Sequence, residues 1–177
     1  GLSITEWELF VGLLPPTDID SWVKYFNSYK QIPQYTLLNY NMSLEEFKFI
    51  FLWEYAHRLI ARFIGVLFLI PFLFFIFINF LKKEMIIKLL YVFILILLQG
   101  TIGWYMVKSG LTTNTTVSHY RLSMHLFFAF SILISLTWIL LNSINTTNKK
   151  FFQVNTRNII LKLLLVMLFV QIISGAF

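Results

Sequence analysis

Four long apolar runs alternate with polar segments along the chain. They cover residues 60–80, 86–107, 122–141 and 159–177, and each run holds a single ionisable side chain, which is Arg62, Lys88, His125 and Lys162 in turn. A helix rises about 1.5 Å per residue and the bilayer hydrocarbon is about 30 Å thick, so runs of about twenty apolar residues are long enough to cross it. The pattern therefore predicts four membrane-spanning helices.

The first 54 residues have a different pattern, with aromatic residues and turn signals in place of a long apolar run. Pro15-Pro16 breaks the chain, Thr17-Asp18 offers a helix cap, and residues 20–30 are predicted to form a short helix that Pro33 closes. Ser43 with Glu46 three residues later is a capping box, and the helix that begins there is predicted to continue into the first span. Pro71 is expected to kink that span. The predicted fold class is all-α, a polytopic transmembrane helical bundle.

Composition and charge refine this picture. The chain is 58% hydrophobic with no cysteine, which excludes disulfides and Cys-ligated metals but leaves histidine ligation open. Seven of the eight acidic residues lie in the first 54 positions. Basic residues follow the first and third spans: Lys82, Lys83, Lys88, Lys149, Lys150, Arg157 and Lys162. The positive-inside rule places these connections in the cytoplasm and residues 1–54 and 108–118 outside, so the net charge of +6 reflects topology and no nucleic-acid partner is expected.

Ionisable residues gather where the first span begins, in the sequence from Glu54 to Arg62. Such groups cost roughly 2.5–3.5 kcal/mol each within the hydrocarbon, so their presence suggests a site. Glu54, His57 and Arg58 share one side of the predicted helix with small residues at positions 61 and 65, which leave room for a flat, bulky group.

The third span begins with a similar combination, in which Arg121 and His125 are four residues apart on one helix face. The topology puts His57 and His125 on the same side of the membrane at similar depth. Two imidazoles from neighbouring helices can ligate one haem iron from opposite faces. Arg58 and Arg121 would then pair with the haem propionates.

Simpler interpretations compete with each of these assignments. A histidine near a membrane interface is more often a hydrogen-bonded interfacial group, and arginines there can extend to lipid headgroups. Glu54 could support His57 or take part in proton chemistry, or it could only form an ion pair with Arg58. We expect a structural or solvated role for His119. The matched pair of histidines, each with an arginine, favours ligation.

Several motifs resemble those of haem A synthase of the alphaproteobacterial and mitochondrial type. They are the segments 1–7, 29–35, 47–58, 99–111 and 120–126, which include Trp53-Glu54-Tyr55-Ala56-His57-Arg58 and Tyr120-Arg121-Leu122-Ser123-Met124-His125. They occur in the order and at the spacing of the family, and the resemblance covers nearly the whole chain. The sequence departs from the family in lacking a glycine before Arg62 and a cysteine pair in the outer loop.

The resemblance implies an eight-helix protein of two four-helix bundles that oxidises the C8 methyl group of haem O to the formyl group of haem A for cytochrome oxidase. His57 and His125 match the iron ligands of the substrate haem O, Glu54 matches a carboxylate important for catalysis, and Arg58 and Arg121 match motif arginines.

On this comparison residues 1–54 form the outward-facing first loop with short helices, and residues 55–141 form helices two to four of the N-terminal bundle. Residues 142–158 form a cytoplasmic connection, and residues 159–177 begin the C-terminal bundle. Both ends are expected to be cut from a longer protein whose second half holds haem b. The chain alone, as an incomplete four-helix haem-binding half, is expected to be inactive.

Two other functions fit the same residues. A b-type electron-transfer subunit would use two histidines without needing Glu54, and a transporter could line a path with the charges. The expected partners are membrane lipid, haem O synthase and an electron donor, with self-association open, in a bacterial or mitochondrial inner membrane.

Overall fold

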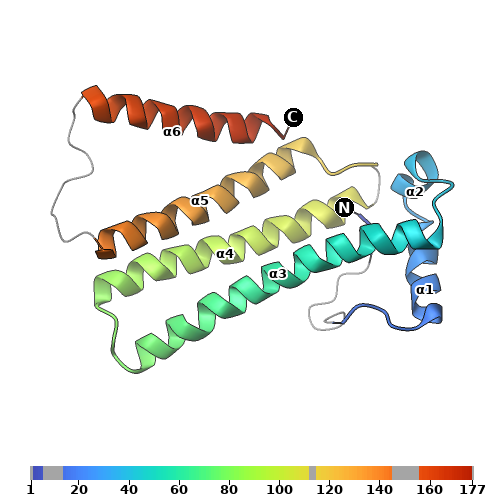
Figure 1. Ribbon diagram of the computed structural model, residues 1–177, viewed down its shortest axis with the longest axis horizontal. Coiled ribbons are helices and arrows are strands. Elements are labelled where there is room, and N and C mark those ends of the chain that lie inside the picture. Colours follow the sequence, from blue (N-terminus) through green and yellow to red (C-terminus); the bar gives the residue numbers. More distant parts are fainter. Residues whose placement is uncertain (1, 6–13, 112–114, 145–155, 177) are drawn as a thin grey trace. The chain divides into compact units, whose positions relative to one another are not determined.

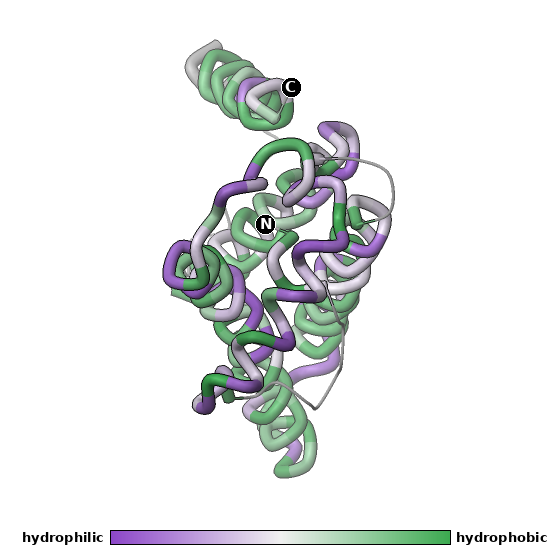
Figure 2. Tube along the Cα trace, turned by 90° about the vertical axis from the view of Figure 1, so that its right-hand side faces the viewer, coloured by the Kyte–Doolittle hydropathy of each residue, from purple (hydrophilic) through white to green (hydrophobic). Residues whose placement is uncertain are grey.

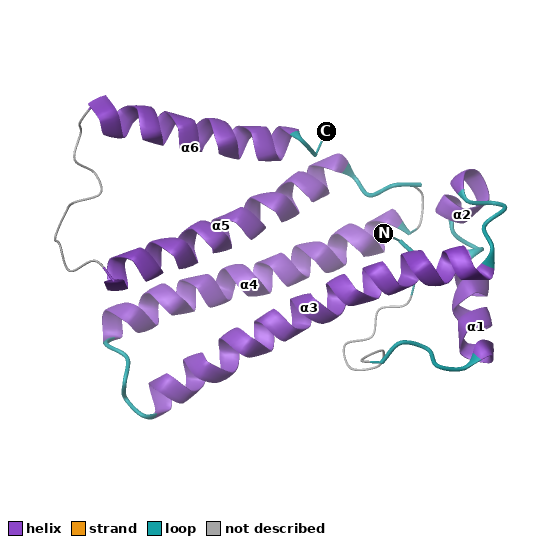
Figure 3. Ribbon diagram, viewed as in Figure 1, coloured by secondary structure: helices purple, strands orange, loops and turns teal. Residues whose placement is uncertain are grey.

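The computed structural model describes residues 2–5, 14–111, 115–144 and 156–176. Within these ranges every regular element is a helix, as Figure 3 shows. The helices are α1 (Ile19–Tyr29), α2 (Pro33–Leu38), α3 (Leu44–Phe77), α4 (Lys83–Gly110), α5 (His119–Ile144) and α6 (Thr156–Ser174), labelled in Figure 1. The predicted all-α fold class is confirmed.

Three of these helices, α3, α4 and α5, are long and apolar enough to cross a membrane. Hydrophobic positions dominate them in Figure 2, and many of their large side chains are exposed, such as Phe63, Phe77 and Leu133. Exposed apolar side chains along such helices suit contact with lipid rather than water. The fourth predicted span forms α6, whose apolar part Ile159–Ser174 is shorter. The chain is therefore a multi-pass membrane protein.

Hydroxyl side chains within the long helices bond to their own helix. Thr101, Ser131 and Thr137 each donate to the carbonyl oxygen four residues earlier, at 2.7–2.9 Å. A polar group in hydrocarbon is costly unless it has a hydrogen-bond partner, and these local bonds supply one. The helices can therefore carry these residues across a bilayer.

The short N-terminal helices follow local signals. The Asp18 carboxylate accepts a hydrogen bond from the Ser21 amide at 2.8 Å and caps α1, which the sequence predicted. Pro33 does more than close α1, because it starts α2 at the first helical position, where its missing N–H costs nothing. The prediction that Pro33 only ends a helix was therefore incomplete.

The capping box at the start of α3 is present as predicted. The Ser43 hydroxyl and amide both donate to the Glu46 carboxylate at 2.8 Å, and the Glu46 amide donates to the Ser43 hydroxyl at 3.3 Å. The helix then continues without a break through Pro71 to Phe77. A kink at Pro71 stays a prediction.

The chain divides into two compact units, and each is described by itself. The first comprises residues 1–74 and 103–118, and its core is a cluster around Tyr29, Phe47 and Phe51 that joins α1 and α2 to the beginning of α3. The second comprises residues 75–102 and 119–177, in which α5 and α6 pack together through an edge-to-face contact of Phe127 and Phe169. In the predicted cytoplasmic connection, residues 145–155 lie outside the described residues.

Candidate functional site

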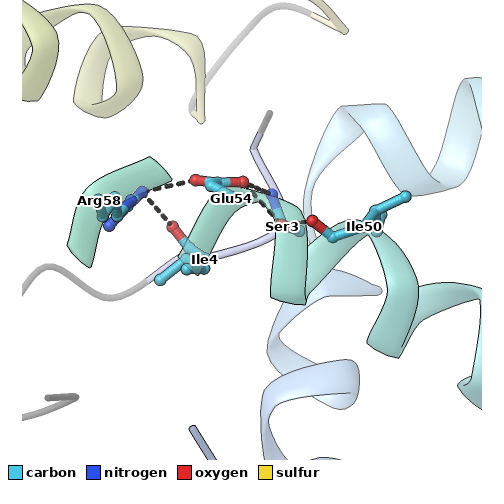
Figure 4. Close-up of polar contacts among 5 residues, drawn as sticks. All are labelled: Ser3, Ile4, Ile50, Glu54 and Arg58. Carbon is cyan, nitrogen blue, oxygen red and sulfur yellow. Dashed lines mark hydrogen bonds and ion pairs between the residues drawn. The ribbon is translucent and has the colours of Figure 1, made fainter. Parts of the chain in front are cut away.

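Glu54 is held by the N-terminal segment of the chain, as Figure 4 shows. Its Oε2 atom accepts a hydrogen bond from the Ser3 hydroxyl at 2.6 Å and another from the Ser3 amide at 2.8 Å. The Glu54 side chain is only 8% exposed. A carboxylate removed from water needs such donors, because burying it without them costs several kcal/mol.

Arg58 forms an ion pair with the other carboxylate oxygen of Glu54. Its Nη2 lies 2.6 Å from Oε1 of Glu54 and also donates to the Ile4 carbonyl at 3.2 Å. The two residues are one helical turn apart, which is the spacing at which oppositely charged side chains meet. The ion pair anticipated in the sequence is therefore present, and both oxygens of Glu54 are engaged (Figure 4).

His57 lies between these two residues in the sequence but is exposed, whereas Glu54 is nearly covered. The same turn of α3 thus carries an anchored carboxylate and an accessible imidazole. Arg58 has five N–H donors, so its contacts with Glu54 and Ile4 leave donors that could pair with a propionate.

The second predicted ligand, His125, lies in α5 and is partly buried. Its Nε2 is 3.1 Å from the amide nitrogen of Gln99 in α4. Which of the two groups donates depends on the tautomer of the imidazole. This contact occupies Nε2, so Nε2 could ligate a metal only after Gln99 moves away. Arg121 stands one turn before His125 in the same helix, as the sequence predicted.

His119 is the first residue of α5, and its Nδ1 lies 3.1 Å from the carbonyl oxygen of Ala176. Nearby Ser123, which is buried, donates to the carbonyls of His119 and Ile173. These contacts connect α5 to the end of α6. They agree with the structural role expected for His119.

A haem is compatible with this set of donors. The porphyrin supplies four ligands to the iron, so the protein needs only one or two axial groups, and an imidazole with a free lone pair is the usual one. Among the described residues no group of three or more His, Asp or Glu side chains forms a metal site of another kind. His57 lies in the first unit and His125 in the second, and their pairing stays a prediction.

The first unit contains a cavity of about 380 Å³. It is lined by Thr5, Trp104, Val107, Lys108 and Leu111. None of the five predicted site residues contributes to this lining, so the cavity does not mark the predicted haem site.

Two residues of the site were not predicted from the sequence. Ser3 binds Glu54 across 51 positions of sequence, and Gln99 binds His125 across 26. Gln99 had a signal, because it is an amide inside an otherwise apolar run. Ser3 lies in the motif of residues 1–7, but nothing in that motif indicates a contact with Glu54.

The comparison with known families decides the assignment. The family model described as COX15-CtaA, cytochrome oxidase assembly protein, matches residues 1–177. The chain belongs to this family. The motifs around Glu54, His57, Arg58, Arg121 and His125 thus lie within a match to COX15-CtaA that covers the whole chain.

Curated relatives of this COX15-CtaA chain carry the name heme A synthase. The protein of that name from Pelagibacter ubique is 50% identical over all of this chain and 52% of its own length. Those from Nitrosospira multiformis and Parvibaculum lavamentivorans are 44% and 42% identical over all of this chain and 50% and 51% of their lengths. The chain spans about half the length of these relatives. No solved structure matches it.

Proposed function

We propose that this chain is the N-terminal half of a haem A synthase, which oxidises the C8 methyl group of haem O to the formyl group of haem A. Membership of a cytochrome oxidase assembly family and three relatives named heme A synthase support this proposal. The observation that carries it is the fixed, nearly buried Glu54 carboxylate in the same helical turn as the accessible His57.

The reaction is a four-electron oxidation. It can proceed as two hydroxylations of the methyl carbon, each of which consumes one dioxygen, two protons and two electrons from the electron donor and releases one water. The resulting geminal diol then loses water to give the formyl group. Protons must leave the carbon during this change. A nearby carboxylate that accepts hydrogen bonds can take up or orient such protons.

Each residue then has a proposed role. His57 and His125 ligate the iron of haem O, and Arg58 and Arg121 bind its propionates through charge-assisted hydrogen bonds. Glu54 faces the reacting edge of the substrate and assists proton removal. The other half of the protein would hold haem b, and haem O synthase and an electron donor are the proposed partners in a bacterial or mitochondrial inner membrane.

The test is a Glu54→Gln variant of the full-length protein. Glutamine keeps the size of glutamate but is neutral and offers one acceptor oxygen in place of two, so it cannot serve as the base. We expect haem A formation to fall by about a hundredfold, while the haem O extracted from the purified protein stays at the wild-type level. Glu45→Gln is the matched control, because Glu45 also forms an ion pair in α3 but is 80% exposed.

Normal haem A formation by Glu54→Gln would contradict the catalytic role. If instead the wild-type full-length protein held haem but produced no haem A, a b-type electron-transfer subunit would be the better account. Loss of activity in Glu45→Gln to the same extent would show that the effect is not specific to Glu54.

A further inference from the structure

Ser3 is the buried polar residue nearest to the candidate catalytic carboxylate. It is 2% exposed, and both its hydroxyl and its backbone N–H point at Oε2 of Glu54, as Figure 4 shows. The 2.6 Å distance from its hydroxyl lies at the short end of the range for hydrogen bonds to a charged acceptor. Such bonds are roughly twice as strong as neutral ones.

We propose that Ser3 is a positioning residue that fixes the Glu54 carboxylate for the oxidation of haem O. The inference rests on the proposed function. Arg58 alone would hold only one oxygen of Glu54 and leave the carboxylate plane able to turn. With Ser3 on the second oxygen, both ends of the group are fixed, and its orientation relative to His57 is set.

The segment that carries Ser3 is itself held firmly. Leu2 is 1% exposed and packs against Gly110 at the end of α4, where an added Cβ would lie 3.1 Å from the Leu2 side chain. On the other side of Ser3, the Ile4 carbonyl accepts a hydrogen bond from Arg58. Packing and hydrogen bonds on both sides of Ser3 therefore keep its hydroxyl in place, which a positioning residue needs.

Positioning predicts a specific kinetic effect. When a catalytic group is displaced by a fraction of an ångström, the enzyme turns over more slowly but binds its substrate as before, because the binding groups are unchanged. In Ser3→Ala the backbone N–H still reaches Glu54, so we expect kcat to fall by about tenfold, with KM and the amount of bound haem O unchanged. Ser3→Thr keeps a hydroxyl and should recover most of the rate.

Ser43→Ala provides the matched control. It removes a serine hydroxyl that also binds a glutamate in α3, at 2.8 Å, but in the exposed capping box. We expect wild-type kcat from this variant. A double variant, Ser3→Ala with Glu54→Gln, should be no slower than Glu54→Gln alone, because Ser3 acts only through Glu54.

Three results would overturn the proposal: wild-type kcat in Ser3→Ala, a further loss of rate in the double variant, or loss of bound haem O and helical content in Ser3→Ala. The last would make Ser3 a structural residue. Failure of the proposed function is distinguishable, because then Glu54→Gln itself would form haem A normally.

Discussion

Glu54 and Arg58 show how two ionisable residues are accommodated at the start of a membrane helix. Their side chains are 8% and 15% exposed and form an ion pair that the N-terminal segment covers. Removing one partner of such a buried pair typically costs roughly 3–5 kcal/mol, because the other charge is left uncompensated. Glutamine also removes the charge that compensates Arg58 but keeps the size of the glutamate side chain, which is why it is preferred to alanine.

Tyr29 offers a test of the core of the first unit. It is fully buried, accepts a hydrogen bond from Asn39 at 2.8 Å and donates one to Gln34. Burial raises the pKa of the Tyr29 phenol above its ordinary value of 10.0. The stability linked to its neutral form is therefore present below pH 10.0 and is lost as the pH rises through the higher pKa of the folded state.

We expect Tyr29→Phe to lower the free energy of unfolding at neutral pH by about 1 kcal/mol per lost hydrogen bond. As the pH rises above 10.0, the variant should lose less stability than the wild type does. Thermal unfolding in detergent, measured across the alkaline range, checks both. Tyr40→Phe is the control, since Tyr40 is 70% exposed. An unchanged alkaline decline in Tyr29→Phe would show that another group is responsible.

At the residue scale the sequence predicted what lies close along the chain. The ion pair of Glu54 and Arg58 follows from the i,i+4 spacing, and the shared face of Arg121 and His125 follows from the same rule. The contacts of Ser3 and Gln99 could not be predicted in this way. They depend on how distant segments pack, and helical periodicity carries no information about that.

Helix boundaries were predictable where a side chain caps them. Asp18 and Ser43 cap α1 and α3 at the positions their sequences indicate. The short helix α2 was missed because a proline after a helix can either end one element or begin the next. Its six residues carry no periodic pattern of their own.

The end of α3 is a second element whose local chemistry can be tested. Asn79 has a φ of 54°, the Phe80 amide bonds to the Phe75 carbonyl, and the Asn79 amide bonds to the Ile76 carbonyl. The ring centroids of Phe75 and Phe80 lie 5.3 Å apart. These are the features of a Schellman motif with its hydrophobic contact, which ends a helix in the left-handed conformation.

Asn79→Val should destabilise this turn by about 1–2 kcal/mol, because a β-branched residue fits the left-handed region poorly. Asn79→Gly should be at least as stable as the wild type, since glycine adopts that conformation freely. The midpoint of unfolding in detergent measures the difference. If both variants unfolded alike, the backbone conformation at Asn79 would not be what ends α3.

At the scale of the whole molecule, hydrophobic run length was the most informative signal. It correctly predicted α3, α4 and α5 as helices that can span a membrane. The sidedness inferred from the basic connections stays a prediction, and Lys149 and Lys150 lie outside the described residues. The family assignment came from motifs spread over the whole chain, which a match over residues 1–177 confirms.

The central claim is that His57 and His125 ligate one haem. His57 is exposed on α3, whereas His125 is partly buried on α5 and would have to exchange its contact with Gln99 for the iron. The decisive question is whether a single bound haem O depends on both. A shared iron makes each histidine necessary, whereas two independent interfacial groups would not affect haem at all.

The most direct measurement is the six-coordinate low-spin spectrum of bound haem O in the purified full-length protein, with the haem extracted and counted against haem b. We predict that His57→Ala and His125→Ala each abolish this signal and leave haem b in place, while His119→Ala retains it. A low-spin haem O signal of wild-type strength in either His57→Ala or His125→Ala would contradict the account.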